Sequence, residues 1–118
     1  MEHDPRAYLW DVQQAASAIK EFIAGLDGEG YARNKLVRAA VERQFEIIGE
    51  ALNQLAKIAP PLASRIPHLG EIIAFRNVLI HGYAVIDHSR VWSNTQERRE
   101  ELHAAVSTLL VELGPPDG

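Results

Sequence analysis

The side chains best suited to chemistry lie in one short stretch of the 118-residue chain, from Phe75 to Tyr83. Arg76, Asn77, His81 and Tyr83 interrupt a run that is otherwise almost wholly apolar. An arginine can bind phosphate oxygens through two parallel hydrogen bonds and stabilise charge that develops on them. A histidine titrates near neutral pH, so it can accept and donate protons. This combination suits cleavage of a phosphodiester, and RNA carries its own nucleophile in the 2′-hydroxyl.

The same residues also have a purely structural interpretation. Asn77 could orient the imidazole or the phosphate, and Tyr83 would place a hydroxyl beside them. However, Arg76 could pair with a carboxylate of a neighbouring helix, and His81 could favour the end of its own helix as a cation. An ideal helix would also separate Arg76 and His81 by roughly 140°. Spacing alone therefore leaves both interpretations open.

Periodic apolar residues predict four long helices, and no segment alternates as a strand would. The first begins at Asp4–Pro5, an N-cap followed by a proline suited to the first helical position. It ends at Gly25 and the glycine-rich run 27–30. The others span about 34–59, 67–81 and 87–113, with Asp87 as the N-cap of the last and an extra turn allowed at 62–65. Gly82 is expected in the left-handed conformation that ends many helices.

These helices indicate an all-α fold, an antiparallel bundle of four main helices. The expected domain covers residues 1–113, and 114–118 form a tail that cannot continue the last helix. The helix over 67–81 is apolar nearly all round, so it belongs either in the middle of the bundle or against a second chain. The pattern by itself favours neither a monomer nor a homodimer.

Composition excludes several classes of function. The chain has no cysteine, which excludes disulfides, thiolate nucleophiles and cysteine-bound zinc, and fits a reducing, cytoplasmic setting. Its net charge of −4 disfavours a general grip on nucleic acid, although a local basic cleft is allowed. No apolar run approaches the roughly 20 residues needed to span a bilayer, so no membrane is expected. Glu46 and Glu50 fit ion pairs with Arg43 or Arg76 better than metal ligands, and no cofactor is expected.

The sequence resembles the HepT-like toxins of the HEPN superfamily over nearly its whole length. Residues 76–83, Arg-Asn-Val-Leu-Ile-His-Gly-Tyr, are similar to the R-x4-H-x-Y signature of that family. Three further segments resemble helices of that family in the same order along the chain. They are the opening segment around Tyr8–Asp11 (its first helix), the stretch 40–51 (its second) and the stretch 86–92 with Val91–Trp92 (its fourth). No residue departs from the pattern within the motif.

The resemblance implies a helical, usually dimeric protein that cleaves RNA without a metal. Arg76 and His81 would be catalytic, and Asn77 stands where the superfamily prefers a polar residue. It also implies a partner, an MntA-like minimal nucleotidyltransferase antitoxin that transfers AMP to the motif tyrosine, here Tyr83. Cleavage by 2′-hydroxyl attack needs both a base and an acid. Two chains that meet along the 67–81 helix would supply both, because they bring two copies of His81 to one cleft.

Two other classes of function fit the same residues. The chain could be a non-catalytic subunit that helps a nucleotidyltransferase bind its substrate, with Arg76 on phosphate and His81 as a simple donor. It could also be a structural helical dimer. Loss of the imidazole should abolish cleavage in a ribonuclease, whereas it should do no more than weaken affinity in a binding subunit.

Overall fold

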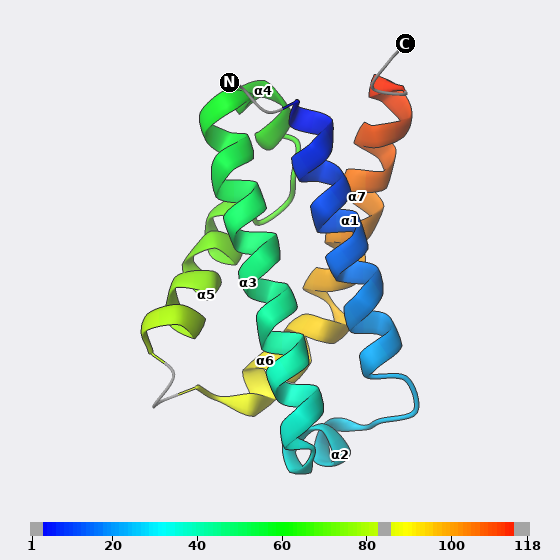
Figure 1. Cartoon of the computed structure of the whole chain (residues 1–118), viewed down its shortest axis with the longest axis vertical. Helices are drawn as coiled ribbons and strands as arrows, with labels where there is room; N and C mark the ends of the chain where they lie inside the picture. Colours follow the sequence, from blue (N-terminus) through cyan, green and yellow to red (C-terminus); the bar gives the residue numbers. More distant parts are fainter. Residues whose placement is uncertain (1–3, 83–85, 115–118) are drawn as a thin grey trace.

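In the computed structural model, which describes residues 4–82 and 86–114, every regular element is a helix (Figure 1). The helices are α1 (Pro5–Phe22), α2 (Gly28–Arg33), α3 (Lys35–Ile58), α4 (Pro60–Ala63), α5 (Leu69–His81), α6 (His88–Gln96) and α7 (Arg98–Leu113). The described residues contain no strand, so the all-α prediction is confirmed. Tyr83 and tail residues 115–118 lie outside them.

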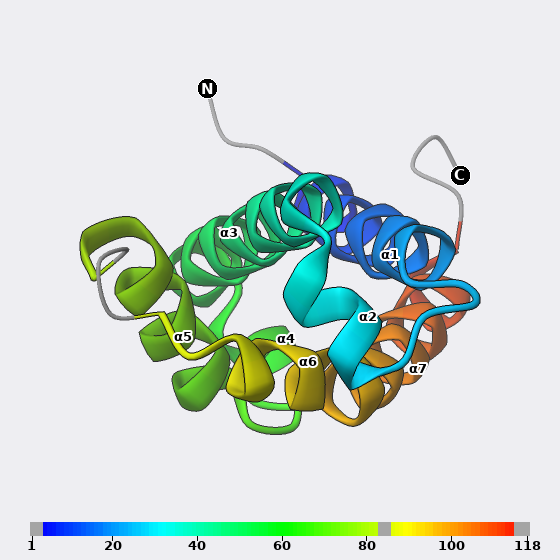
Figure 2. The ribbon, with the colours of Figure 1, turned by 90° about the horizontal axis from the view of Figure 1, so that it is seen from below.

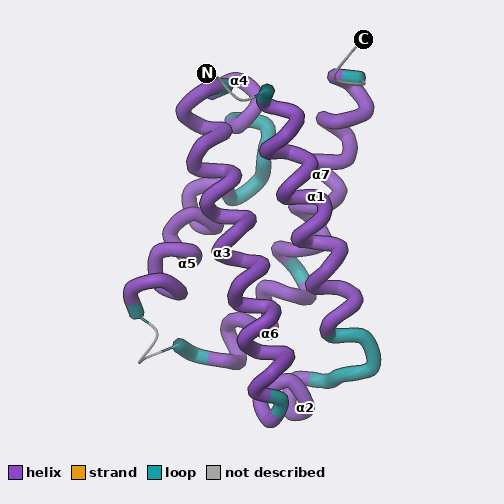
Figure 3. The backbone as a smooth tube through the Cα atoms, viewed as in Figure 1, coloured by secondary structure: helices purple, strands orange, loops and turns teal. Residues whose placement is uncertain are grey.

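Successive long helices run antiparallel, joined by mostly short loops (Figures 1 and 3). α1 packs against both α3 and α7, and α3 also packs against α5 (Figure 2). The short helices α2 and α4 lie at opposite ends of the bundle (Figure 1). None of the described helices combines the length and apolarity needed to cross a membrane.

The core forms where the apolar stripes of the long helices meet. Most of the stripe residues that the periodicity selects are buried, among them Leu9, Val12, Ala16 and Ile19 of α1, Val41, Ile48, Leu52 and Leu55 of α3, and Leu102, Val106 and Leu109 of α7. Burial of one such side chain contributes about 1.5–3 kcal/mol for the larger residues. From α5, Ile72, Phe75 and Leu79 join this core. The other helices therefore fix the position of α5.

The predicted start of α1 is confirmed, but the segment after it differs from the expectation. Asp4 caps α1 by accepting a hydrogen bond from the Arg6 backbone N–H at 2.9 Å. The run 27–30, predicted as a break, instead begins the short helix α2. Asp27 caps that helix by accepting from the Gly30 N–H at 2.7 Å, and Tyr31 anchors it with a fully buried ring. A good cap and one buried aromatic residue thus outweigh the glycines.

The single helix predicted over 87–113 is two helices in the structure. Asp87 is the N-cap as expected, accepting from the Ser89 N–H at 3.0 Å, but the chain bends at Glu97. α6 packs against α2, whereas α7 packs against α1 (Figure 2). One straight helix could not follow both surfaces. At the bend, the Thr95 carbonyl accepts a hydrogen bond from Arg99 Nε at 2.8 Å.

Two local predictions about α5 are corrected. The helix begins at Leu69 rather than at residue 67, because His68 adopts the left-handed conformation with φ +60°. Gly82 ends the helix, as expected, but with φ −114° and not in the left-handed region. Its N–H donates to the Val78 carbonyl at 2.7 Å, and an added Cβ would lie 2.9 Å from that oxygen. Close approach to backbone, not positive φ, is what favours glycine there.

Candidate functional site

Arg76 is placed by the close contact between α5 and α3. Its aliphatic stem packs directly on Gly49, where an added Cβ would lie 2.2 Å from Arg76 Cβ and 2.5 Å from its Cγ. No real side chain could occupy that space without moving one of the helices. A glycine inside a helix costs roughly 0.5–1 kcal/mol relative to alanine. Gly49 therefore has a packing role: it lets the stem of Arg76 lie against α3.

Polar partners fix the guanidinium of Arg76. Nη2 lies 2.6 Å from Glu50 Oε2, and Nη1 donates to Asn77 Oδ1 at 2.8 Å. The Nε atom is buried and has no hydrogen-bond partner in the described chain. The pairing with a carboxylate of the second long helix, which the sequence left open for Arg76, is thus present, with Glu50 as its partner. A guanidinium carries five N–H donors, so these two contacts leave donors for a phosphate.

Arg76 also lines a cleft of about 260 Å³ between α1, α3 and α5. The lining residues are Tyr8, Asp11, Arg43, Glu46, Ile47, Glu50, Ala51, Arg76 and Ile80. Arg43 Nη1 lies 3.3 Å from Glu46 Oε1, so the second predicted ion pair of α3 is also present. Two arginines face three carboxylates here, which makes the cleft mixed in charge rather than basic.

Sequence reasoning did not assign Arg43 and Tyr8 to the same site as Arg76. A signal for Arg43 existed, because Arg43 and Glu50 are seven residues apart and so lie on one face of α3. For Tyr8 the sequence offered no such signal, since its place depends on how α1 packs against α3.

His81 is held in a different way from Arg76. It is the last residue of α5, its side chain is exposed, and it is not among the residues that line the Arg76 cleft. It makes no hydrogen bond or ion pair with another described residue. A cation at this position is favourable because the C-terminus of a helix carries partial negative charge. Within one chain, the structure therefore joins Arg76 to Asn77 and leaves His81 apart.

The apolar character of α5 is divided between two surfaces. Ile72, Phe75 and Leu79 face the core, whereas Val78 and Ile80 are 40% and 37% exposed. The neighbouring helices thus do not cover all of the apolar surface that the sequence predicts. Val78 and Ile80 are two residues apart, so they project from different sides of α5, and Ile80 lines the Arg76 cleft.

The described part of the chain has no cluster of three or more histidine, aspartate or glutamate side chains placed to hold a metal ion. Glu46 and Glu50, the pair weighed as metal ligands, are engaged by Arg43 and Arg76 instead.

This all-helical fold, which carries the Arg-x4-His pair on α5 at the edge of the bundle against α3, is consistent with the HEPN type (Figure 2). Residues 12–109 match the family model described as "HepT-like: Ribonuclease HepT-like". The chain belongs to this HepT-like ribonuclease family, and its enzyme class is ribonuclease. The motif residues 76–81 lie within the matched range, so the resemblance drawn from the sequence is confirmed.

Individual relatives agree with this assignment. The chain is 33% identical to "Putative RNase MJ1380" of Methanocaldococcus jannaschii over 96 residues, covering 81% of this chain and 87% of the relative. It is 30% identical to "Putative RNase TTE0752" of Caldanaerobacter subterraneus, covering 90% and 94%. It is 32% identical to "Probable ribonuclease HepT" of Thermococcus cleftensis, covering 82% and 87%. No solved structure matches the chain.

Proposed function

We propose that this protein is a metal-independent endoribonuclease toxin of a type VII-like HepT/MntA toxin–antitoxin system. The observation that carries the proposal is the placing of Arg76. Its guanidinium is fixed by Glu50 and Asn77, with donors left for a phosphate, on the helix that ends in an exposed His81. Such preorganised donors stabilise charge that develops in a transition state.

The proposed reaction uses the nucleophile that RNA supplies. The 2′-hydroxyl oxygen bonds to the adjacent phosphorus and loses its proton to a base, while the 5′-oxygen of the next nucleotide leaves and gains a proton from an acid. Arg76 binds the non-bridging oxygens and stabilises their added charge. His81 transfers protons, and Asn77 acts through Arg76, whose Nη1 it fixes at 2.8 Å. The step requires no metal or cofactor.

A homodimer would supply the second proton-transfer group. One chain has one His81, but the reaction needs a base and an acid. Val78, Ile80 and His81 are all exposed in the last turn of α5, so two chains that pair at this end of the helix would cover apolar side chains and bring two imidazoles together. The distance of His81 from the Arg76 cleft within one chain supports a composite site, in which the residues of two copies act together.

Regulation would act through Tyr83, which lies outside the described residues. An MntA-like nucleotidyltransferase antitoxin would join the phenolic oxygen of Tyr83 to the α-phosphorus of ATP, releasing pyrophosphate and a proton. The AMP group adds bulk and negative charge two residues after His81. That charge would compete with RNA phosphate for the guanidinium of Arg76. The Tyr83→Phe variant should therefore stay active in the presence of antitoxin and ATP, whereas the parent chain should lose activity.

The deciding experiment is RNA cleavage in chelator by the chain purified without its antitoxin. The His81→Ala variant tests the imidazole, and His103→Ala on α7 is the matched histidine control. Cleavage that survives chelator, persists in the control and disappears in His81→Ala supports the proposal.

Equal cleavage by all three chains would show that His81 is not catalytic and would overturn the mechanism. A different result would support a substrate-binding subunit of a nucleotidyltransferase complex. In that result, the chain binds RNA or a nucleotide without cleaving RNA, and its intact mass shows that Tyr83 is unmodified.

A further inference from the structure

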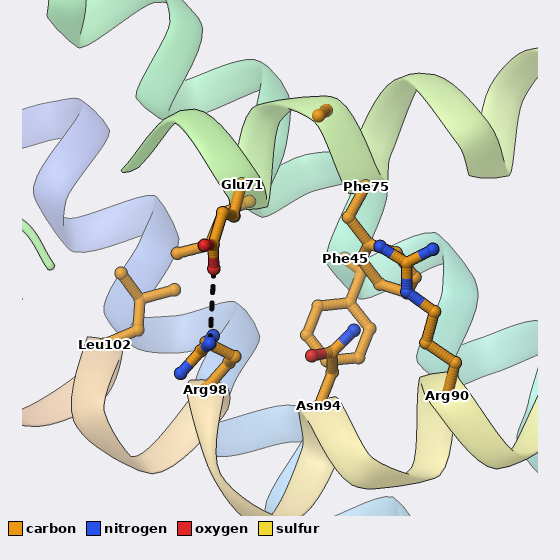
Figure 4. Close-up of a pocket in the computed structure, with 9 residues that line it drawn as sticks. Phe45, Glu71, Phe75, Arg90, Asn94, Arg98 and Leu102 are labelled. Atoms are coloured by element: carbon orange, nitrogen blue, oxygen red, sulfur yellow. Dashed lines mark hydrogen bonds and ion pairs between the residues drawn. The ribbon is translucent and has the colours of Figure 1, made fainter. Parts of the chain in front are cut away.

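A second cavity lies across α5 from the Arg76 cleft. It has a volume of about 430 Å³ and is lined by residues of α3, α5, α6 and α7 (Figure 4). Its lining residues are Phe45, Glu71, Ile72, Ala74, Phe75, Arg90, Asn94, Arg98 and Leu102. Small-molecule pockets commonly have volumes of roughly 300–1,000 Å³, so one nucleoside-sized group would fit. Neither the motif nor the proposed reaction uses this cavity.

The cavity combines an apolar floor with a row of polar groups. Phe45 and Phe75 meet edge to face, with ring centroids 5.3 Å apart, and both are buried. Arg90 and Asn94, four residues apart on α6, lie beside these rings, whereas Arg98 at the start of α7 points to Glu71 (Figure 4). Asn94 offers both a donor and an acceptor, as the edge of a nucleobase requires.

Among the described residues, Arg90 has no anionic partner, unlike the other arginine of this cavity. Its guanidinium carbon lies 5.8 Å from the centroid of the Phe75 ring, and it makes no ion pair or side-chain hydrogen bond with the described residues. Arg98, by contrast, is neutralised by Glu71 and Glu101, each at 3.2 Å. In a chain of net charge −4, an exposed and unpaired guanidinium over an aromatic ring is ready for an anion.

Ala74, which lines the cavity, lies on the same stripe of α5 as His81. Ala74, Val78 and His81 are separated by four and then three residues, which places them along one stripe of the helix. Seven residues of helix rise about 10 Å. His81 and the mouth of the cavity are therefore close enough to contact neighbouring nucleotides of one extended RNA strand. The exposed Ala74 and Val78 leave the path between them open.

We infer that this cavity is an RNA-binding subsite that holds a nucleotide flanking the scissile bond. Arg90 binds that nucleotide's phosphate, the base enters over Phe75, and the amide of Asn94 meets the base edge. This inference rests on the proposed ribonuclease function and extends it, because it gives the acidic protein a specific contact with RNA beyond Arg76. Bases extruded onto aromatic rings and arginine planes are the usual mode of single-strand recognition.

The test measures the affinity of a labelled, mixed-sequence single-stranded RNA by fluorescence anisotropy. All variants are made in the His81→Ala background, so that RNA is not cut. Arg90→Ala should weaken binding roughly tenfold, as loss of a charged hydrogen bond does. It should also flatten the dependence of log affinity on log salt concentration by about 0.7, the value for one phosphate contact on a single strand.

Two further variants distinguish binding in the cavity from a general effect of positive charge on RNA affinity. Arg33→Ala on α2 removes the same charge from an exposed pair with Glu29, and it should leave affinity and salt slope unchanged. Asn94→Leu keeps the net charge but removes the amide, so it should weaken binding with no change of salt slope. Both patterns together support a subsite that holds base and phosphate.

Equal affinities for Arg90→Ala and Arg33→Ala would overturn the subsite, and unchanged binding by Asn94→Leu would overturn a base in the cavity. Neither outcome would affect the ribonuclease proposal if the parent chain cleaves RNA. Failure of the His81→Ala background to bind any RNA, together with no cleavage by the parent chain, would reject both proposals.

Discussion

Arg76 and His81 stand five residues apart on α5 and are held in opposite ways. The Arg76 side chain is 22% exposed, its stem is packed on Gly49, and its head is fixed by Glu50 and Asn77. His81 is exposed at the helix end without a described partner. The position of the arginine is therefore a property of the fold, whereas that of the histidine depends on what approaches the helix end. Changes at the two sites should separate stability from chemistry.

The largest effect is expected from His81→Ala. Loss of a proton-transfer group lowers cleavage by roughly 10²–10⁴-fold. The free energy of unfolding should stay nearly constant, because an exposed side chain without partners contributes little to the fold. Cleavage rates and urea unfolding of the same preparation would check both parts. A large loss of stability would contradict the view that the His81 side chain contributes little to the stability of the fold.

The next largest effect, on stability and on cleavage, is expected from Gly49→Ala, with a second helical glycine as its control. Gly49→Ala would force a methyl group into the stem of Arg76, so we expect a loss of roughly 1–3 kcal/mol in stability and a drop in cleavage. Gly70→Ala is the matched control, because its added Cβ meets no atom within 4 Å and alanine favours a helix by up to about 1 kcal/mol. Thermal and urea unfolding would measure both. Similar stabilities would mean that Arg76 and α3 can separate easily.

Tyr31 provides an internal measure of whether a variant keeps its fold. Burial raises the pKa of Tyr31 well above its ordinary value of 10.0, with the Glu42 carboxylate adding to the shift. Above about pH 10 the tyrosine ionises in the unfolded chain but not in the folded one. Stability should then fall with rising pH by about 1.4 kcal/mol per pH unit.

Replacement of Tyr31 by phenylalanine should abolish this alkaline contribution, whereas Tyr8→Phe should retain it. Unfolding in urea between pH 9 and 11 would test the difference. If His81→Ala truly changes chemistry alone, it should show the same alkaline slope as the parent chain. A different slope in that variant would indicate an altered fold.

The smallest effect is expected from Glu50→Gln. The pair with Arg76 is partly exposed, and ion pairs of this kind contribute up to about 1 kcal/mol. The amide still accepts a hydrogen bond but no longer repels phosphate, so affinity for RNA should rise a few-fold in the His81→Ala background. Anisotropy titrations would measure this rise. Weaker RNA binding would show that the carboxylate is needed to position the guanidinium.

The sequence by itself determined the all-α fold, the longest helix and the residues of the motif. Apolar spacing along 34–59 depends on short-range periodicity alone, and α3 fills nearly all of that range. Local chemistry likewise predicted the caps at Asp4 and Asp87, because an aspartate hydrogen-bonds backbone N–H groups of its own first turn. The Arg-x4-His signature needs no tertiary information to be recognised.

The tertiary structure decided what those residues contact. The bend at Glu97 arises because α6 and α7 pack on different helices, and no local signal marks it. Gly49 beneath Arg76 and Arg90 over Phe75 both join residues far apart in the chain, 27 and 15 positions respectively. Periodicity indicates which face of a helix is buried but not which helix covers it. For that physical reason, the packing of Arg76 on Gly49 and the second cavity appear only in the folded chain.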